Sequence, residues 1–322
     1  MYYAMSKNKK NLGREMDIIS FAESENGLGI PLLPVQKFIL KMFYGLPLEG
    51  LEKTITLPTE DNSAVIGSFT EKEFLQYLID TGRTNVVSYS EDYSPTELVL
   101  NAGRRSTKSV IEGIICGYEL YKLKSKHNPQ RYYGMPDDGE ISVCVVSCTV
   151  EQAGVFRDLM MKDYIPQSWR RNGAVKPTRA NSFSIEGDGG TTIRVVSGGC
   201  NGNSIYGNSS ILVVMDEMAF FRDDRKVYER LIPSITSFTP KDEGTHPTGS
   251  CEGRVVMVST PFGKKGKFYE KYIESFSEPD MILMFDMYST MLNPTIDGGF
   301  LKNEKNWNPQ AFSSEFEAVF TD

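Results

Sequence analysis

The chain has 322 residues, of which 40% are hydrophobic and 24% charged, and its formal net charge is −7. This size allows a large core, so we expect one main domain with a smaller subdomain. The acidic balance excludes a protein that coats DNA by itself, because phosphate binding needs clustered cations. No apolar run reaches about 18 residues and no signal-peptide segment is recognisable, so neither a membrane span nor export is expected.

Histidine and cysteine usage narrows the chemistry further. The chain has two histidines, both in polar surroundings, which excludes a histidine-based zinc site and disfavours a serine–histidine hydrolase. The five cysteines form no CxxC pair. Reduced thiols in an intracellular protein are therefore expected rather than disulfides or metal ligands. They are Cys116, Cys144, Cys148, Cys200 and Cys251.

The first quarter of the chain precedes the main core. Residues 1–14 are polar and basic and are expected to fray, whereas 19–51 have a helical pattern. Within 57–80, a short strand precedes GSFTEKEFLQYLID, whose Ser/Thr start and glutamates are typical of a helix N-terminus.

From about residue 86 to 287, apolar strands alternate with helical segments. We predict strands at 96–101, 141–148, 192–197, 211–216, 254–260 and 281–287, and helices after residues 108, 150, 223 and 266. This alternation predicts an α/β fold with a mostly parallel central sheet and helices on both faces. Residues 288–322 form a C-terminal return.

The first chemical motif joins the strand at 96–101 to the helix that follows. Ala102–Thr107 is a turn of small and basic residues. Such a loop at a helix N-terminus presents unpaired backbone N–H groups to a phosphate. Lys108 can then reach the terminal phosphates, and the Ser109 hydroxyl can ligate Mg²⁺. The strict P-loop pattern has glycine at the positions of Ala102 and Thr107, so a basic turn without a ligand is the alternative.

The second motif is the strand ILVVMDE at 211–217, which ends in two adjacent carboxylates. A short run rich in β-branched residues is typical of a buried parallel strand. Asp216 and Glu217 are therefore expected at the edge where an open α/β sheet binds its ligands. Buried carboxylates need cationic partners, and Mg²⁺ with a nucleotide is the usual one. A strand that ends in a solvated acidic turn is the alternative.

The third motif is the strand RVVMVSTP at 254–261, which ends in the hydroxyls of Ser259 and Thr260. Beside the acidic strand, these hydroxyls can hydrogen-bond to a γ-phosphate or to the attacking water. They can also relay the presence of the phosphate or water to the following loop. The position of this strand, after the phosphate loop and the acidic strand, supports that interpretation.

The three motifs in this order closely resemble the ATPase domain of the large terminase subunit, the DNA-packaging motor of tailed bacteriophages. The resemblance covers roughly residues 30–320 and includes GRRSTKS at 103–109, MDEMAFF at 215–221 and STPFGKKGKFYE at 259–270. Upstream, Pro34-Val35-Gln36 fits the family's adenine-sensing glutamine. The segment FSSEFEAVF at 312–320 is similar to the one that closes the ATPase half.

The resemblance implies a P-loop NTPase fold of the ASCE type with a small lid subdomain. We expect an N-terminal lid or adenine-side segment at 1–55, the ATPase core at 56–290 and a C-terminal lid or linker at 291–322. ATP and Mg²⁺ are the implied cofactors. The implied nucleotide-binding residues are Gln36, Gly103, Arg104, Arg105, Ser106, Thr107, Lys108, Ser109, Ser259 and Thr260. Ser109 and Asp216 are the implied metal ligands, Glu217 the general base, and Lys108, Arg104 and Arg105 the other catalytic residues.

The implied function is ATP hydrolysis that drives double-stranded viral DNA into a procapsid in the host cell cytoplasm. The expected partners are double-stranded DNA, the portal protein, the small terminase subunit and further copies in a ring on the procapsid. We expect a monomer when the chain is isolated, and no membrane association. The family's nuclease half needs a further fold beyond Asp322, so nuclease activity is not expected. A helicase- or recombinase-like DNA-dependent ATPase and a non-catalytic nucleotide-binding module are the alternatives.

Two departures from the family pattern bear on activity. Thr107 stands where glycine precedes the lysine, and a β-branched residue tolerates positive φ poorly. The segment 201–210 lacks the arginine that many relatives carry, so an arginine that acts in trans must come from elsewhere. The candidates are Arg170, Arg171, Arg179 and Arg194. The first three lie in a predicted loop at 165–183, for which a solvated surface is the alternative.

Overall fold

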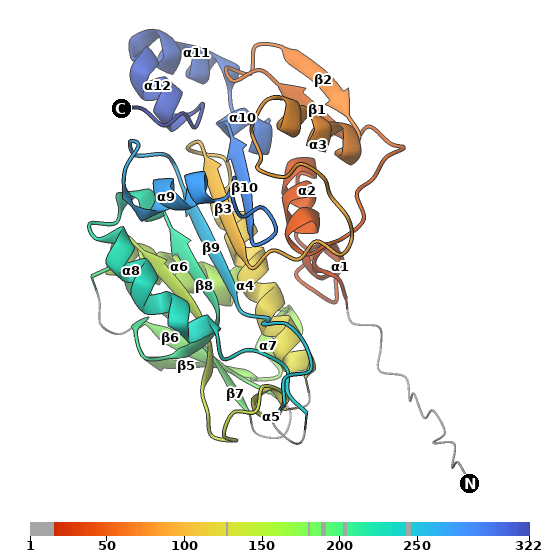
Figure 1. The fold of residues 1–322 in the computed structure, drawn as a ribbon, viewed down its shortest axis with the longest axis vertical. Helices are drawn as coiled ribbons and strands as arrows, with labels where there is room; N and C mark the ends of the chain where they lie inside the picture. The colour runs from red at the N-terminus through yellow and green to blue at the C-terminus, as the bar shows by residue number, and fades with distance from the viewer. Residues whose placement is uncertain (1–15, 127, 180, 188–190, 202–204, 243–245) are drawn as a thin grey trace.

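The computed structural model describes residues 16–126, 128–179, 181–187, 191–201, 205–242 and 246–322. The predicted frayed segment 1–14 and His127, one of the two histidines predicted to lie in polar surroundings, fall outside these residues. In this part of the chain, an eight-stranded sheet has the order β10-β3-β9-β8-β4-β7-β6-β5 (Figure 1). Neighbouring strands from β10 to β7 are parallel, whereas β6 and β5 extend the sheet antiparallel at one edge. The strands are β3 (Glu97–Ala102), β4 (Ile141–Ser147), β5 (Val175–Arg179), β6 (Ser182–Glu186), β7 (Thr192–Gly199), β8 (Ser209–Asp216), β9 (Arg254–Ser259) and β10 (Ile282–Met287).

The helices lie between and around these strands, and all six strands predicted from apolar runs are present. The predicted helices after residues 108, 150, 223 and 266 correspond to α4, α6, α8 and α9. The helices are α1 (Ile18–Glu23), α2 (Pro34–Phe43), α3 (Glu71–Asp80), α4 (Lys108–Ser125), α5 (Pro129–Tyr132), α6 (Val150–Asp163), α7 (Gln167–Arg171), α8 (Asp224–Leu231), α9 (Gly266–Glu274), α10 (Ser289–Leu292), α11 (Gly298–Trp307) and α12 (Pro309–Glu315). Two 3₁₀ turns, η3 (Met218–Phe220) and η4 (Ile232–Ile235), flank α8.

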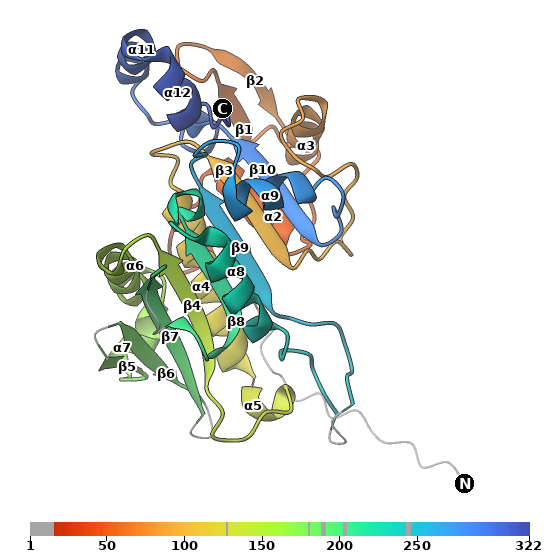
Figure 2. The same ribbon diagram turned by 60° about the vertical axis from the view of Figure 1, so that its left-hand side comes forward.

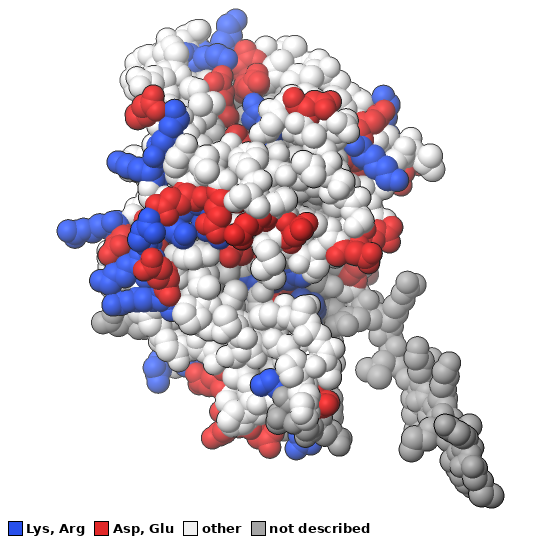
Figure 3. All heavy atoms as spheres, in the orientation of Figure 1, with Lys and Arg blue, Asp and Glu red and all other residues white. Residues whose placement is uncertain are grey.

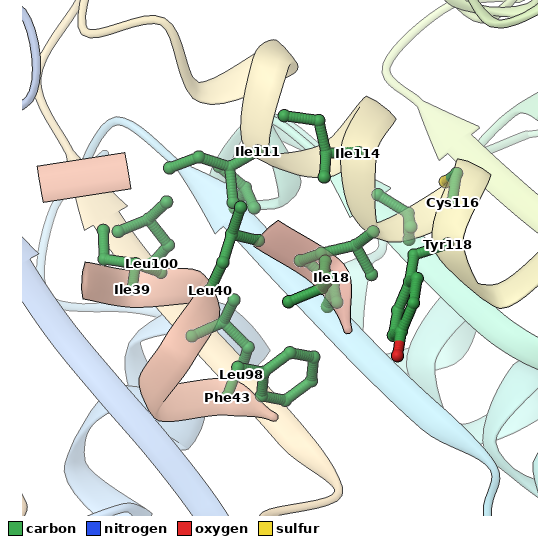
Figure 4. Close-up of a cluster of buried hydrophobic side chains, with 14 of the residues drawn as sticks. Ile18, Ile39, Leu40, Phe43, Leu98, Leu100, Ile111, Ile114, Cys116 and Tyr118 are labelled. Carbon is green, nitrogen blue, oxygen red and sulfur yellow. The ribbon is translucent and has the colours of Figure 1, made fainter. Parts of the chain in front are cut away.

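The central sheet has a hydrophobic core on each face, because side chains alternate along every strand. On β8, Leu212 and Val214 belong to one core, and Val213 and Met215 to the other. The first core lies against α1, α2, α4 and α6, and Figure 4 shows its side chains from α1, α2, β3 and α4. The second lies under α8 and α9, which cover the opposite face (Figure 2). The predicted α/β fold with helices on both faces is confirmed.

A small two-stranded sheet precedes α3. It pairs β1 (Ile55–Pro58) with β2 (Val65–Phe69) in antiparallel fashion. Thr70 caps α3 by accepting a hydrogen bond from the Glu73 N–H, and the Glu73 side chain accepts one from the Thr70 N–H. This reciprocal capping box is the Ser/Thr and glutamate signal that predicted the helix start. The described residues contain no helix with the length and apolarity needed to cross a membrane.

The prediction of a loop at 165–183 is wrong. The segment instead forms the short helix α7 and the strand β5, and it continues into β6, which pairs with β7. Backbone pairing of β5 with β6, and of β6 with β7, supplies stabilisation that the local sequence does not indicate. Pro177 and exposed polar side chains interrupt the apolar pattern of β5. Such composition is typical of an edge strand.

The strand order brings the three motifs together. β9 lies between β3 and β8, and all three run parallel, so their carboxyl ends meet at one edge of the sheet. The chain returns to the same edge after β10, where α10, α11 and α12 lie beyond the tip of β3 (Figure 1). This edge is the place at which an open α/β sheet binds ligands.

Candidate active site

Lys108 is the meeting point of the three motifs. Its Nζ atom donates a hydrogen bond to Thr260 Oγ1 at 3.0 Å and lies 3.5 Å from Glu217 Oε1. It also donates to the backbone carbonyls of Ala102 and Gly103, at 3.3 and 3.2 Å. The side chain is only 8% exposed, so a buried ammonium lies between the phosphate loop, the acidic strand and the hydroxyl strand.

Glu217 links the ends of β8 and β9. Its Oε2 atom accepts a hydrogen bond from the Thr260 N–H at 3.1 Å and one from Ser259 Oγ at 3.4 Å. Ser259 Oγ in turn accepts a hydrogen bond from the Ala219 N–H at 3.1 Å. Glu217 has a φ of 55°, and a non-glycine residue in that region is uncommon and concentrated at functional sites. The carboxylate is therefore held in place by the strand that the sequence predicted beside it.

Asp216 lies at the end of β8, beside the end of β4. Ser147 Oγ, at the end of β4, donates to Asp216 Oδ2 at 3.3 Å. Burial and the adjacent Glu217 charge raise the pKa of Asp216 to about 6, although Lys108 and Ser147 act in the opposite direction. Ser147 was not among the predicted site residues, because its only signal was its place at the end of a predicted strand.

Glu112 is a second residue that the sequence analysis did not identify. It lies one turn after Lys108 on α4 and is completely buried, and neither of its carboxylate oxygens has a hydrogen-bond partner among the described residues. Burial raises the pKa of Glu112 well above its usual value. The charges of Asp216 and Glu217 raise this pKa further, whereas the charge of Lys108 lowers it. A carboxyl group on an otherwise apolar helix face was the available signal.

Replacing Glu112 with Gln is expected to stabilise the nucleotide-free protein at pH 7. The folded state raises the pKa of Glu112 above its ordinary value of 4.5, so above that pH the folded state binds more protons than the unfolded state. The resulting penalty grows as the pH rises. The Glu112→Gln variant cannot ionise there and should gain about 1–3 kcal/mol, because keeping the carboxyl protonated costs about 1.4 kcal/mol for each pH unit above its ordinary pKa.

Urea unfolding at pH 7 and at pH 4 measures this effect. The gain of the Glu112→Gln variant should disappear at pH 4, where both states are protonated. The exposed Glu229 on α8 provides the matched control, because Glu229→Gln should leave stability unchanged at both values. A parent protein that is more stable than the Glu112→Gln variant at pH 7 contradicts the expectation.

The start of the phosphate loop is packed against the C-terminal segment. The Arg104 N–H donates to the Glu315 carbonyl at 2.5 Å, and Ser289 Oγ donates to the Arg104 carbonyl at 2.7 Å. A Cβ atom on Gly103 would lie 2.2 Å from Ser289 Oγ and 2.6 Å from the Phe316 carbonyl oxygen. Glycine is therefore required at position 103 by close approach of a neighbouring backbone.

The two loop arginines also contact this C-terminal segment. Arg104 Nη2 lies 3.3 Å from Glu315 Oε1. The Arg105 guanidinium lies over the Phe300 ring at 5.0 Å, and the Arg105 carbonyl accepts a hydrogen bond from Asn293 Nδ2 at 2.9 Å. Both arginines are exposed. Their predicted catalytic role stays a prediction.

The other predicted loop residues differ in exposure. Ser106 is buried, and within the part of the chain that the structure describes its hydroxyl has no hydrogen-bond partner, whereas Ser109 is exposed on the first turn of α4. Thr107 lies directly before that helix with a φ of 63°. Gln36, on α2, donates from Nε2 to Thr107 Oγ1 at 2.7 Å. The structure thus brings Gln36 to the phosphate loop across 71 positions in the sequence.

The arginines predicted to act in trans belong to α7, β5 and β7, and not to the three strands β3, β9 and β8 that carry the motifs. Arg170 and Arg171 are exposed on α7, and Arg179 is exposed at the end of β5. Arg194 lies on β7, where its Nη1 atom pairs with Glu140 Oε2 at 2.9 Å and its side chain is 16% exposed. Arg194 is therefore the least available of the four.

These features define a P-loop fold of the ASCE type: a loop between β3 and α4, an acidic pair at the end of β8, and the intervening strand β9. The chain belongs to the family described as "Uncharacterized protein MJ0330, N-terminal P-loop domain", whose model matches residues 4–318. No curated protein sequence matches the chain.

Solved structures of large terminases share the fold. The ATPase domain of the Thermus phage P74-26 large terminase is 16% identical, with 72% of this chain and 91% of that chain covered and a TM-score of 0.51. The HK97 bacteriophage large terminase is 14% identical, with 88% of this chain covered and a TM-score of 0.52. The match spans 55% of the HK97 protein. The predicted resemblance to terminase ATPase domains is thus confirmed at the level of the fold.

Proposed function

We propose that the protein hydrolyses ATP by in-line attack of water in a magnesium-dependent reaction. The observation that carries the proposal is the contact of Lys108 with both Glu217 and Thr260, which joins the phosphate loop, the acidic pair and the hydroxyl strand in one buried site. The backbone N–H groups of residues 105–108 cradle the phosphates, because those of Gly103 and Arg104 already donate to the carbonyls of Met287 and Glu315. Lys108 donates to the β- and γ-phosphate oxygens, and Glu217 accepts the proton of the attacking water.

The residues present fit a magnesium ion. Ser109 and Asp216 provide hard oxygen ligands of the kind that Mg²⁺ prefers, and the Ser109 hydroxyl is exposed on the first turn of α4. Bound there, the ion would neutralise charge on the phosphate oxygens. Thr260 donates its hydroxyl proton toward the γ-phosphate when Lys108 moves from the Thr260 oxygen to the phosphate.

An apolar cavity of about 360 Å³ offers a place for the adenine base. Its lining includes Leu33, Pro34 and Val35 from the start of α2, and Met291 and Leu292 from α10. Both lining segments adjoin residues that contact the phosphate loop, because Gln36 bonds to Thr107 and Asn293 bonds to Arg105. A base in this cavity would therefore lie close to phosphates held by the loop.

The biological role that we propose is translocation of double-stranded viral DNA into a procapsid in the host cell cytoplasm. The terminase-like fold and the three motifs support it, and the portal protein and the small terminase subunit are the proposed partners. Figure 3 shows basic side chains gathered over α8 but mixed with acidic ones. With a net charge of −7, a single copy is poorly suited to hold DNA, so we propose that a ring of copies on the procapsid does so.

Ring formation predicts that hydrolysis depends on protein concentration. Specific activity should rise over a roughly hundredfold concentration range by mass action, and double-stranded DNA should raise it further. Replacement of Arg170, Arg171 or Arg179 by Ala should flatten the rise without a change in ATP affinity. Lys302, exposed on α11, provides the control, because Lys302→Ala should behave as the parent.

A mixing experiment completes this test. An arginine-deficient protein mixed with the Glu217→Gln variant should recover part of the hydrolysis, because each copy supplies what the other lacks. Constant specific activity, unaffected by DNA and by all three arginine changes, would contradict the ring. The proposal would then be a site completed within one chain by Arg104 or Arg105, in place of a site completed by a neighbouring copy.

A further inference from the structure

Thr107 has a backbone conformation that its side chain disfavours. It lies directly before Lys108 with φ 63° and ψ 30°, in the left-handed region. That conformation is costly for L-residues and especially so for a β-branched one. Glycine would adopt it freely. Something outside the loop must therefore compensate for the threonine, since the direction of the following N–H groups and of Lys108 depends on this residue.

Gln36 supplies a connected set of hydrogen bonds at this point. Its Oε1 atom accepts from the Leu33 N–H at 2.9 Å, which caps α2, and its Nε2 atom donates to Thr107 Oγ1 at 2.7 Å. The Thr107 hydroxyl donates to the Ser106 carbonyl at 2.5 Å. Gln36 is 2% exposed, so these bonds are shielded from water, where hydrogen bonds are strongest.

The contacts of Gln36 leave it little freedom to recognise a base. The apolar cavity beside α2 is lined by its neighbours Leu33, Pro34 and Val35, but not by Gln36 itself. The carbonyl group of its side chain is used by the Leu33 N–H and its amide group by Thr107. The side chain thus faces the phosphate loop.

We propose that Gln36 is a positioning residue that acts on the phosphates through Thr107. Its hydrogen bond holds the threonine hydroxyl, and with it the left-handed backbone, in the form in which the loop receives a triphosphate. A glycine before Lys108 would adopt this left-handed conformation without support, whereas Thr107 adopts it with the support of Gln36. The inference rests on the proposed nucleotide-binding function for its affinity test, but not for its stability test.

A double-mutant cycle separates this role from base recognition. The variants are Gln36→Met, Thr107→Gly and their combination, and the probes are Mg-ATP and Mg-tripolyphosphate, which has no base. In the parent background, Gln36→Met should weaken binding of both probes by about tenfold, the effect of roughly 1.4 kcal/mol. In the Thr107→Gly background, Gln36→Met should change the affinity for Mg-ATP and for Mg-tripolyphosphate by less than about twofold. Calorimetry measures all four proteins.

Two outcomes would overturn the proposal. Equal losses from Gln36→Met in both backgrounds would show that it does not act through Thr107. A loss for ATP without a loss for tripolyphosphate would place Gln36 on the base.

Thermal unfolding of the nucleotide-free variants provides a readout that does not require ligand binding. Gln36→Met should lower the melting temperature less in the Thr107→Gly background than in the parent. Thr107→Val keeps the branched shape and loses the hydroxyl, so it should lower the melting temperature by itself. In the Thr107→Val background, Gln36→Met should lower it less than in the parent, because only the bond to the Leu33 N–H is left to lose. If the parent binds neither probe, the proposed function fails. The difference between the Gln36→Met effects on the melting temperature in the two backgrounds still decides whether Gln36 supports Thr107.

Discussion

Replacing Glu217 with Gln is expected to lower steady-state ATP hydrolysis by about 10²-fold or more, the usual contribution of a general base. Glutamine is isosteric and can still accept the Thr260 N–H bond through its amide oxygen, so the end of β8 should keep its position. It cannot accept the proton of the attacking water. ATP affinity should therefore stay within a few-fold of the parent value, while phosphate release falls.

Phosphate release under saturating ATP and calorimetric titration together measure these two quantities. Glu229→Gln serves as the matched control, because Glu229 is exposed on α8, away from the contacts of Lys108, and should retain parent activity. Hydrolysis by the Glu217→Gln protein near the parent rate would remove Glu217 as the base. A loss of affinity equal to the loss of rate would indicate a binding role instead.

The fold was predictable where a strand is buried on both faces. Such strands have continuous apolar sequences, and β4, β8 and β9 are buried along most of their length. β5 and β6 were missed because their pattern is different. β5 is mostly exposed and contains Pro177, and β6 alternates polar Ser182 and Ser184 with apolar residues. β6 pairs with β7 and β5 pairs with β6, and local sequence does not reveal this pairing.

The candidate site was predictable in its local parts and not in its long-range parts. The positions of Lys108, Asp216 and Glu217 follow from strands and a helix that the sequence indicates. The support of the loop by Ser289 and Phe316 joins residues that lie far apart in the chain. The burial of Glu112 depends on how α4 lies against the sheet. Neither feature has a signature within a short window of sequence.

Lys108→Ala is expected to abolish productive ATP binding. Lys108 Nζ is the ammonium within reach of both Glu217 and Thr260, and its bonds to phosphate oxygens would be charge-assisted. Such bonds contribute about 1.5–3 kcal/mol each. The loss of two of them corresponds to roughly 10²- to 10⁴-fold in affinity. The substitution also removes the positive charge that opposes the rise in the pKa values of Asp216 and Glu112.

Calorimetric titration with Mg-ATP tests this expectation, and Lys302→Ala provides a lysine control on the exposed surface of α11. Unfolding measurements show whether the Lys108→Ala protein is folded under the titration conditions. Because the Lys108 charge opposes the rise in the pKa of both Asp216 and Glu112, the variant should lose stability as the pH rises above the ordinary pKa values of these two carboxyl groups. At lower pH, those carboxyl groups are neutral and the variant should approach the parent in stability. An unchanged ATP affinity in a folded Lys108→Ala protein would mean that the phosphates bind elsewhere, and the assignment of the loop at 103–109 would have to be abandoned.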